Sequence, residues 1–423
     1  MTQPNGSDST ARTTGPLNSP FLSGLLKKTT EAGLKRAQEL KVSETEVAEW
    51  IARTFLESLQ ATAPMVVRSL YRLTPSMLAE HDRLRKGFER RLRLVWGAGL
   101  DRFYATYVAG MEAGELHAQA VVDEARVEND IRYEALVRLH GRSCQVVSEI
   151  YALLKSGHAA GAEARWRTLH EMAVVASLIF DGDQSLAERY LLHATISLWA
   201  DAKAYEKYRI RLGLPSLDQS DIDAIEEART QLLSRYGQSY DQPWGWASPL
   251  FTSESAANSR RHRVTFRDLE DLARLDHYRP FYQLGSHRIH AGARSMELDR
   301  VTVGEGDTSM LAGPSNAGLA DVGSGAIHSF LIVSTSFLGV RATEDPEALL
   351  FMHVLTRLTD LTGAQFIECN SRLATYIEEM DTAMSRGPLS AQVLEAKRAL
   401  RWWTGNARSF LRRVRWRIRR SGT

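Results

Sequence analysis

Apolar residues recur at alternating spacings of three and four along most of the chain, and this spacing constrains the fold more than any other feature. It begins after the capping-box sequence Ser43-Glu44-Thr45-Glu46, where Val47, Trp50 and Ile51 share one helical face. Similar patterns cover residues 75–110, 112–155, 159–180, 184–212, 221–236, 266–276, 346–380 and 390–420. The sequence therefore predicts a mainly α protein with a multi-helix, bundle-like core and little or no β-sheet. Brief alternation over residues 296–303 predicts a short hairpin.

Changes in composition divide the pattern into five segments. Residues 1–35 begin with a stretch rich in Thr, Ser, Pro, Asn and Gly, which predicts a disordered leader. We expect an N-terminal helical region over 36–127, a helical core over 128–345, C-terminal helices over 346–396 and a basic tail helix over 397–423.

The composition is that of an ordinary globular protein. Of 423 residues, 25% are charged and 43% hydrophobic, which excludes collagen-like, disulfide-scaffold and wholly disordered classes. Two cysteines, Cys144 and Cys369, are typical of a reducing compartment, so we expect a cytoplasmic protein. The weakly polar run over 319–340 is interrupted by Asp321 and His328, which favours a buried core helix over a membrane span.

The formal net charge of +2 conceals an asymmetry. Residues 397–420 contain ten Lys or Arg, so the preceding chain carries 2 − 10 = −8. Arginines interleaved with Trp and Phe suit nucleic acid or an anionic membrane surface, and the alternative is docking of this helix on the acidic body. The basic positions that would make these contacts are Arg401, Arg408, Arg412, Arg415 and Arg419.

Two polar stripes interrupt the apolar faces of the expected core helices. Arg167 and Glu171 lie one turn apart beside an apolar stripe, so they can pair in a partly buried setting. Tyr282, Ser286 and His290 are spaced four apart and predict a second stripe with hydrogen-bonding and titratable groups. Each stripe predicts either a functional pocket or a structural seam that fixes helix packing.

These stripes carry a resemblance to a known family. The sequences Arg167-Thr-Leu-His-Glu171, Trp244-Gly-Trp246-Ala and Tyr282-x3-Ser286-x3-His290 resemble the bacterial helical domain of unknown function numbered 5677, over about residues 128–340. The resemblance implies an α-helical fold in which Arg167, Glu171, Tyr282, Ser286 and His290 converge as a candidate catalytic or binding pocket. It implies no reaction, and it associates the chain with accessory or phage-defence proteins.

Three functions remain open from the sequence. The first is a sensor or effector in stress or phage defence, with a ligand in the polar pocket and a possible homo-oligomeric assembly. The second is a metal-independent ribonuclease of the HEPN class with His290 as base, although the Arg165-to-His170 spacing matches that class no better than chance. The third is a non-catalytic interaction module.

The sequence contains no recognisable metal or cofactor motif. His287 and His290 lack the further His, Cys or carboxylate ligands of a metal motif, and the Gly-rich stretches lack the strand-then-helix context of a dinucleotide loop. We therefore predict no metal and no cofactor.

Overall fold

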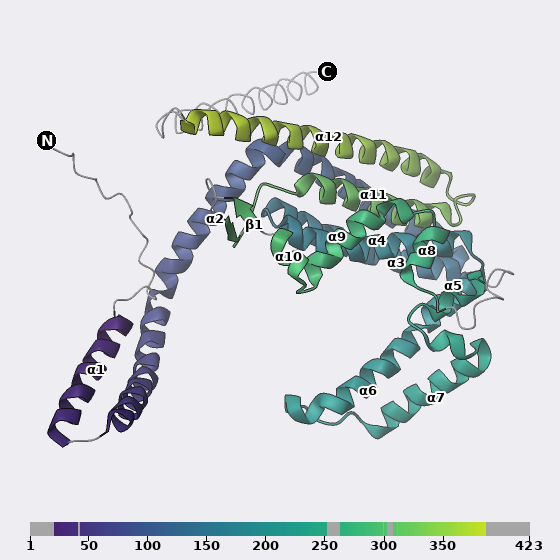
Figure 1. Ribbon diagram of the computed structural model, residues 1–423. Coiled ribbons are helices and arrows are strands. Elements are labelled where there is room, and N and C mark those ends of the chain that lie inside the picture. Colours follow the sequence, from purple (N-terminus) through teal and green to yellow (C-terminus); the bar gives the residue numbers. More distant parts are fainter. Residues whose placement is uncertain are drawn as a thin grey trace. The chain divides into compact units, whose positions relative to one another are not determined.

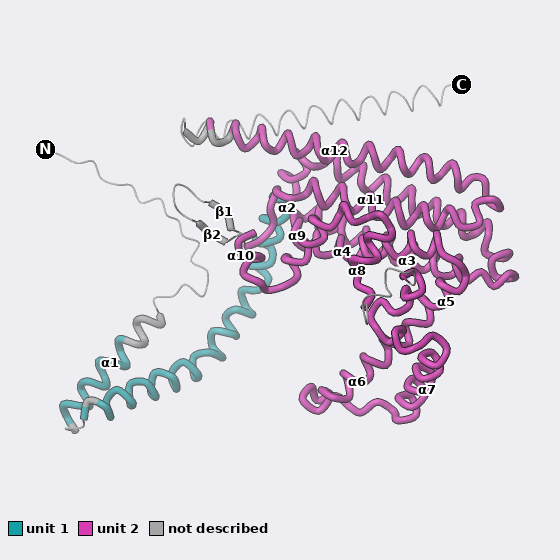
Figure 2. The backbone as a smooth tube through the Cα atoms, turned by 45° about the vertical axis from the view of Figure 1, so that its right-hand side comes forward, with its two compact units in different colours: residues 1–88 teal, residues 89–423 magenta. Residues whose placement is uncertain are grey.

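The computed structural model describes most of the central chain. The described residues are 21–40, 43–251, 263–298, 300–302, 308–310 and 312–385. The expected basic tail, with Arg401, Arg408, Arg412, Arg415 and Arg419, lies outside the described residues, as does the leader before Phe21. Contacts divide the chain into two compact units, Met1–Phe88 and Glu89–Thr423 (Figure 2).

The first unit contains α1 (Phe21–Leu40) and the beginning of α2 (Glu44–Val127). The predicted capping box is present, because the Ser43 amide donates to Glu46 Oε2 at 2.9 Å and the Glu46 amide donates to Ser43 Oγ at 3.4 Å. The leader prediction for residues 1–35 is corrected from Phe21 onward, where α1 is helical. Pro64 and Pro75 lie inside α2, so Pro75 does not begin a new helix as the pattern suggested.

Helices also make up nearly all of the described part of the second unit (Figure 1). Their bounds are α3 (Ile131–Lys155), α4 (Ala159–Asp181), α5 (Gln184–Leu192), α6 (Ala194–Leu212), α7 (Gln219–Tyr236), α8 (Phe266–Leu272), α9 (Arg279–Ile289), α10 (Ala293–Leu298), α11 (Leu319–Gly339) and α12 (Pro346–Ser385). Short 3₁₀ helices, η1 (Gln238–Asp241), η2 (Gly245–Phe251) and η4 (Asp276–Tyr278), connect some of them. The mainly α prediction is confirmed.

A two-stranded hairpin accompanies the helices. Strand β1 (Arg300–Thr302) pairs antiparallel with β2 (Thr308–Met310), with Val301 opposite Ser309. The alternation at 296–303 thus predicted a hairpin in nearly the right place. Met296 and Leu298 nevertheless belong to α10, so the hairpin begins later than the alternation suggested.

Helix α11 occupies the core of the second unit and packs against α3, α4 and α12. Most of its apolar side chains, including Phe330 and Phe337, are almost completely buried. By length and composition α11 could cross a membrane, but 61% of its most apolar window is buried within the protein. That burial supports the predicted core helix, and within the described residues α11 alone meets the membrane criterion.

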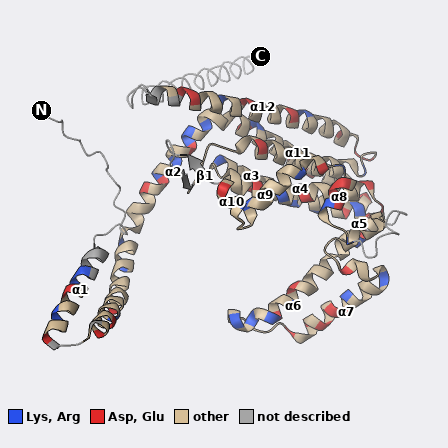
Figure 3. Cartoon of the chain, viewed as in Figure 1, with Lys and Arg blue, Asp and Glu red and all other residues tan. Residues whose placement is uncertain are grey.

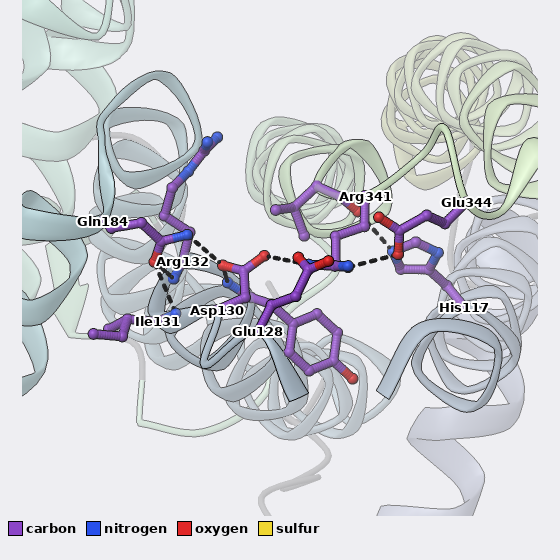
Figure 4. Close-up of polar contacts among 10 residues, drawn as sticks. His117, Glu128, Asp130, Ile131, Arg132, Gln184, Arg341 and Glu344 are labelled. Carbon is purple, nitrogen blue, oxygen red and sulfur yellow. Dashed lines mark hydrogen bonds and ion pairs between the residues drawn. The ribbon is translucent and has the colours of Figure 1, made fainter. Parts of the chain in front are cut away.

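A polar cluster joins helix ends at one side of this unit (Figure 4). Arg341, between α11 and α12, donates to Glu128 Oε2 at 2.8 Å, Asp130 Oδ2 at 3.1 Å and Glu344 Oε2 at 2.7 Å. Burial tends to raise the pKa of Asp130, but hydrogen bonds from Gln184, the Tyr133 amide and Arg341 outweigh it and lower that pKa. The cluster therefore ties the start of α3 to the α11–α12 connection.

A buried histidine makes the stability of the second unit depend on pH. His140 stacks on Phe330 and Phe337, and burial lowers its pKa to about 4. An unfolded chain binds this proton near pH 6.5, so stability falls as pH drops from about 6.5 towards 4, by up to about 3 kcal/mol. We expect His140→Leu to flatten that part of the pH profile of urea unfolding, measured against the exposed-site variant His81→Leu. An unchanged slope would contradict this assignment.

Candidate functional site

The predicted Arg167–Glu171 pair is present on α4, and a tyrosine from α9 lies between its members. Arg167 Nη2 donates to the Tyr282 hydroxyl at 2.6 Å, and that hydroxyl donates to Glu171 Oε1 at 2.6 Å. Arg167 and Glu171 themselves are 3.7 Å apart, and the guanidinium also lies 4.2 Å from the centroid of the Tyr282 ring. The three residues form a relay that holds α9 against α4.

Close backbone packing supports this relay. Gly285, three residues after Tyr282, faces α4, and a Cβ there would lie 3.0 Å from Arg167 Cγ. Burial, then hydrogen bonding to Glu171, raises the pKa of Tyr282. A phenol held in its neutral form is a poor base or nucleophile, so the relay positions helices instead of activating Tyr282.

The structure places the rest of the second stripe differently. Helix α9 ends at Ile289, so His290 occupies the C-cap with extended backbone and is exposed. Ser286 is half-buried, and its carbonyl accepts from the His290 amide at 3.1 Å. Arg167, Glu171 and Tyr282 are therefore together, whereas the end of the helix turns His290 out of their line.

A second polar group, which the sequence analysis missed, lies beside this relay. His170 Nε2 donates to Glu270 Oε1 at 2.8 Å, and both side chains are fully buried. Arg279, at the start of α9, forms an ion pair with the other carboxylate oxygen of Glu270. The sequence signal for this group was the position of His170 inside Arg167-Thr-Leu-His-Glu171. Glu270 and Arg279 lie in ordinary amphipathic patterns, which contain no signal of a buried ion pair.

The fully buried position of His170 also bears on the ribonuclease alternative. A histidine that accepts or donates protons during RNA cleavage must contact the substrate. His170 instead contacts Trp166, Tyr278 and Tyr282 through its ring. The Arg165-to-His170 spacing therefore forms no accessible site in this structure.

A cavity of about 410 Å³ lies on the neighbouring face of α9, between α4, α9 and α11. Its volume falls within the range of small-molecule sites. Trp166, Tyr278, Phe281 and Leu284 supply apolar surface, and polar groups converge on it from α4, α9 and α11. These polar groups are Glu163, Arg288, Asp321, Ser324 and His328.

Local packing fixes the aromatic wall of this cavity. Trp166 Nε1 donates to Ser329 Oγ at 3.0 Å, which anchors the indole against α11. A Cβ at Gly325 would lie 3.3 Å from the indole, so glycine lets the ring approach the helix closely. The relay at Tyr282 holds α9 from its other side, and Phe281 and Leu284 are thereby held at the cavity.

The polar lining is rich in hydrogen-bond acceptors. Glu163 is 3.3 Å from Arg288, while burial raises the pKa of Glu163 and the nearby Asp321 carboxylate adds to that effect. His328 Nδ1 donates to the Ser324 carbonyl at 2.8 Å, which orients the imidazole on α11. Two carboxylates and an imidazole nitrogen thus border a cavity whose one lining cation already pairs with Glu163.

The loop that carries two tryptophans packs against α5 and α8. Arg189 donates to the carbonyls of Trp246 at 2.9 Å and Gly245 at 3.2 Å, and the Trp244 ring lies 5.5 Å from that of Phe266. Among the cavity-lining residues none comes from the described part of this loop. Within the described ranges, no group of three or more His, Cys, Asp or Glu is arranged to hold a metal.

Comparison with known proteins finds a similarity for one part of the chain. No curated protein and no solved structure matches the chain. Residues 133–308 match the model of a family of unknown function, DUF5677. This match, the DUF5677 segment, covers α4, the tryptophan loop and α9, and it confirms the resemblance that the three motifs indicated.

Proposed function

We propose that the DUF5677 segment and α11 together form a binding site for a small organic cation with an aromatic or apolar body. The observation that carries this proposal is the cavity of about 410 Å³, which combines aromatic walls with acceptor groups. Aromatic faces attract cations, and carboxylates next to them strengthen that preference. A cation would also reduce the repulsion between Glu163 and Asp321.

The proposal extends to the cellular role. A helical module whose pocket is held by buried polar contacts suits a sensor that responds to a ligand, in the cytoplasm and in stress or phage defence. The support for that setting is the family resemblance, and the support for ligand binding is the cavity. Arg167, Glu171 and Tyr282 act in this proposal as positioning residues for α9, because their relay faces α4.

Two aromatic probes of similar size and opposite charge test the proposal. We expect phenethylamine to bind the full chain with a Kd of about 1 mM, a value suited to a ligand of so few atoms. Phenylacetate, which carries a carboxylate instead of the amine, should bind at least about tenfold more weakly. Ligand-observed NMR titration measures both, and equal affinities or no binding of the amine would refute the proposal.

Two variants locate the binding. Leu284→Trp fills the cavity and should abolish phenethylamine binding, whereas Leu272→Trp adds the same ring at an exposed position of α8 and should leave it unchanged. Asp321→Asn should weaken binding of the amine several-fold without affecting the fold, because Asp321 is exposed at the cavity. Binding that survives Leu284→Trp would place the ligand elsewhere.

A further inference from the structure

The hairpin of α6 and α7 ends in a tip, residues 207–217, that exposes an unusual number of apolar side chains. Ile210 is 80% exposed, Leu212 66% and Leu214 41%, with Tyr208 and Leu217 also exposed. Tyr208 and Leu212 lie one turn apart on one face of α6, Ile210 lies on the opposite face, and Leu214 and Leu217 follow in the turn. Exposed apolar side chains therefore surround the tip on more than one side, and such a concentration marks an interaction site.

Polar contacts hold the tip in one conformation while its apolar groups remain in solvent. The Leu217 amide donates to Glu206 Oε1 at 2.7 Å, and Tyr205 donates to the Pro215 carbonyl at 2.9 Å. Gly213 ends α6 with a φ of 67°, and the following Leu214 amide donates to the Arg209 carbonyl at 2.9 Å. The turn is thus built against α6 without burying its leucines.

The charges at the tip determine which partner it suits. Residues 207–217 contain Lys207, Arg209 and Arg211, the flanking Glu206 and Asp218 add two carboxylates, and basic groups gather at this end of α6 in Figure 3. Lys207 and Arg211 are exposed, while Arg209 pairs with Glu206 at 2.7 Å. Apolar side chains interleaved with cations complement an anionic bilayer, whose headgroups attract the cations while its acyl boundary accepts the apolar groups.

We propose that the tip of the α6–α7 hairpin inserts into the headgroup region of an anionic membrane surface. Ile210, Leu212 and Leu214 enter the interface, and Lys207 and Arg211 contact lipid phosphates. This role is independent of the cavity between α4, α9 and α11, because no cavity-lining residue belongs to the tip.

A polarity-sensitive dye at the tip tests the proposal in the full chain. The dye is attached to Leu212→Cys in a Cys144→Ser background, where the remaining Cys369 is buried; a control carries it at Leu350→Cys, which replaces a 61% exposed residue of α12. Vesicles of 30% phosphatidylglycerol in phosphatidylcholine should shift the emission of the tip label to the blue, and pure phosphatidylcholine should not. Unchanged emission from the tip label would overturn the proposal, whether another part of the chain binds the vesicles or the tip binds a protein. Equal shifts of emission at both positions would overturn it as well.

Charge variants supply an independent measurement. Removing two surface cations with Lys207→Gln and Arg211→Gln should weaken vesicle binding of the tip-labelled chain about 30-fold. Arg126→Gln with Arg372→Gln removes the same charge from exposed positions of α2 and α12 and should change binding less than about threefold. Equal losses in both pairs would show attraction by net charge alone and would refute a specific role of the tip.

Discussion

Replacing Glu270 by alanine will destabilise the second unit by about 3–5 kcal/mol, the cost of breaking a buried ion pair from one side. Glu270 is fully buried and bonds to both His170 and Arg279. Its loss leaves the buried imidazole without this acceptor and the largely buried guanidinium without this counter-charge. Urea unfolding followed by circular dichroism measures the change.

The neighbouring Asp271 provides a matched control. It lies on the same short helix, α8, but is exposed, so Asp271→Ala should cost no more than about 0.5 kcal/mol. Glu270→Gln keeps one acceptor for His170 while removing the charge, and it should fall between the two. A loss below about 1 kcal/mol for Glu270→Ala would show that the buried group contributes little to the fold.

Replacing Arg341 by alanine should have a comparable effect, about 3–4 kcal/mol, because it leaves the largely buried Asp130 without its cationic partner. The Arg341 side chain is 6% exposed and that of Asp130 is 9% exposed. Alanine keeps the Cβ, so the backbone cost of the φ of 60° at this position is the same in both proteins. The measured difference therefore reports the loss of the side-chain contacts.

The pH dependence of this variant follows from the direction of the Asp130 shift. The pKa of Asp130 is lowered in the folded protein, so its contribution to stability is present above the ordinary aspartate pKa and is lost as pH falls through the folded value. The free energy of unfolding of Arg341→Ala should therefore differ most from that of the parent near neutral pH, and the two values should converge in acid. Arg372→Ala, which removes an exposed pair with Glu368, should cost about 0.5 kcal/mol or less at every pH. A pH-independent deficit in Arg341→Ala would assign its effect to packing.

The two polar networks of the DUF5677 segment differ in exposure and thus in what they can do. His170 and Glu270 are sealed within the protein, whereas the side chain of Glu171 is 34% exposed and reaches solvent at the end of the relay. The sealed pair stabilises the packing of α4, α8 and α9. The relay fixes the rotation of α9, and that rotation determines which side chains face the cavity.

Local sequence determined much of the helical framework. The three-and-four spacing predicts α4, the Ser43–Glu46 capping box predicts the start of α2, and the apolar run at 319–340 predicts the core helix α11. These features depend on neighbours within one or two turns, which is why a single sequence reveals them. The Arg167–Glu171 pair belongs to the same class, since its members lie one turn apart.

Tertiary structure alone decided how these elements form a site. Tyr282 and Glu270 approach α4 from residues about one hundred positions away, and amphipathic spacing does not encode which helices meet. The end of α9 at Ile289 removes His290 from the predicted stripe, because helical spacing has no meaning beyond the last helical residue. The cavity likewise exists only where α4, α9 and α11 leave space among their side chains. The sequence thus determined which faces are polar, and long-range packing decided which of those faces became buried bonds, solvent-exposed surface or the wall of a cavity.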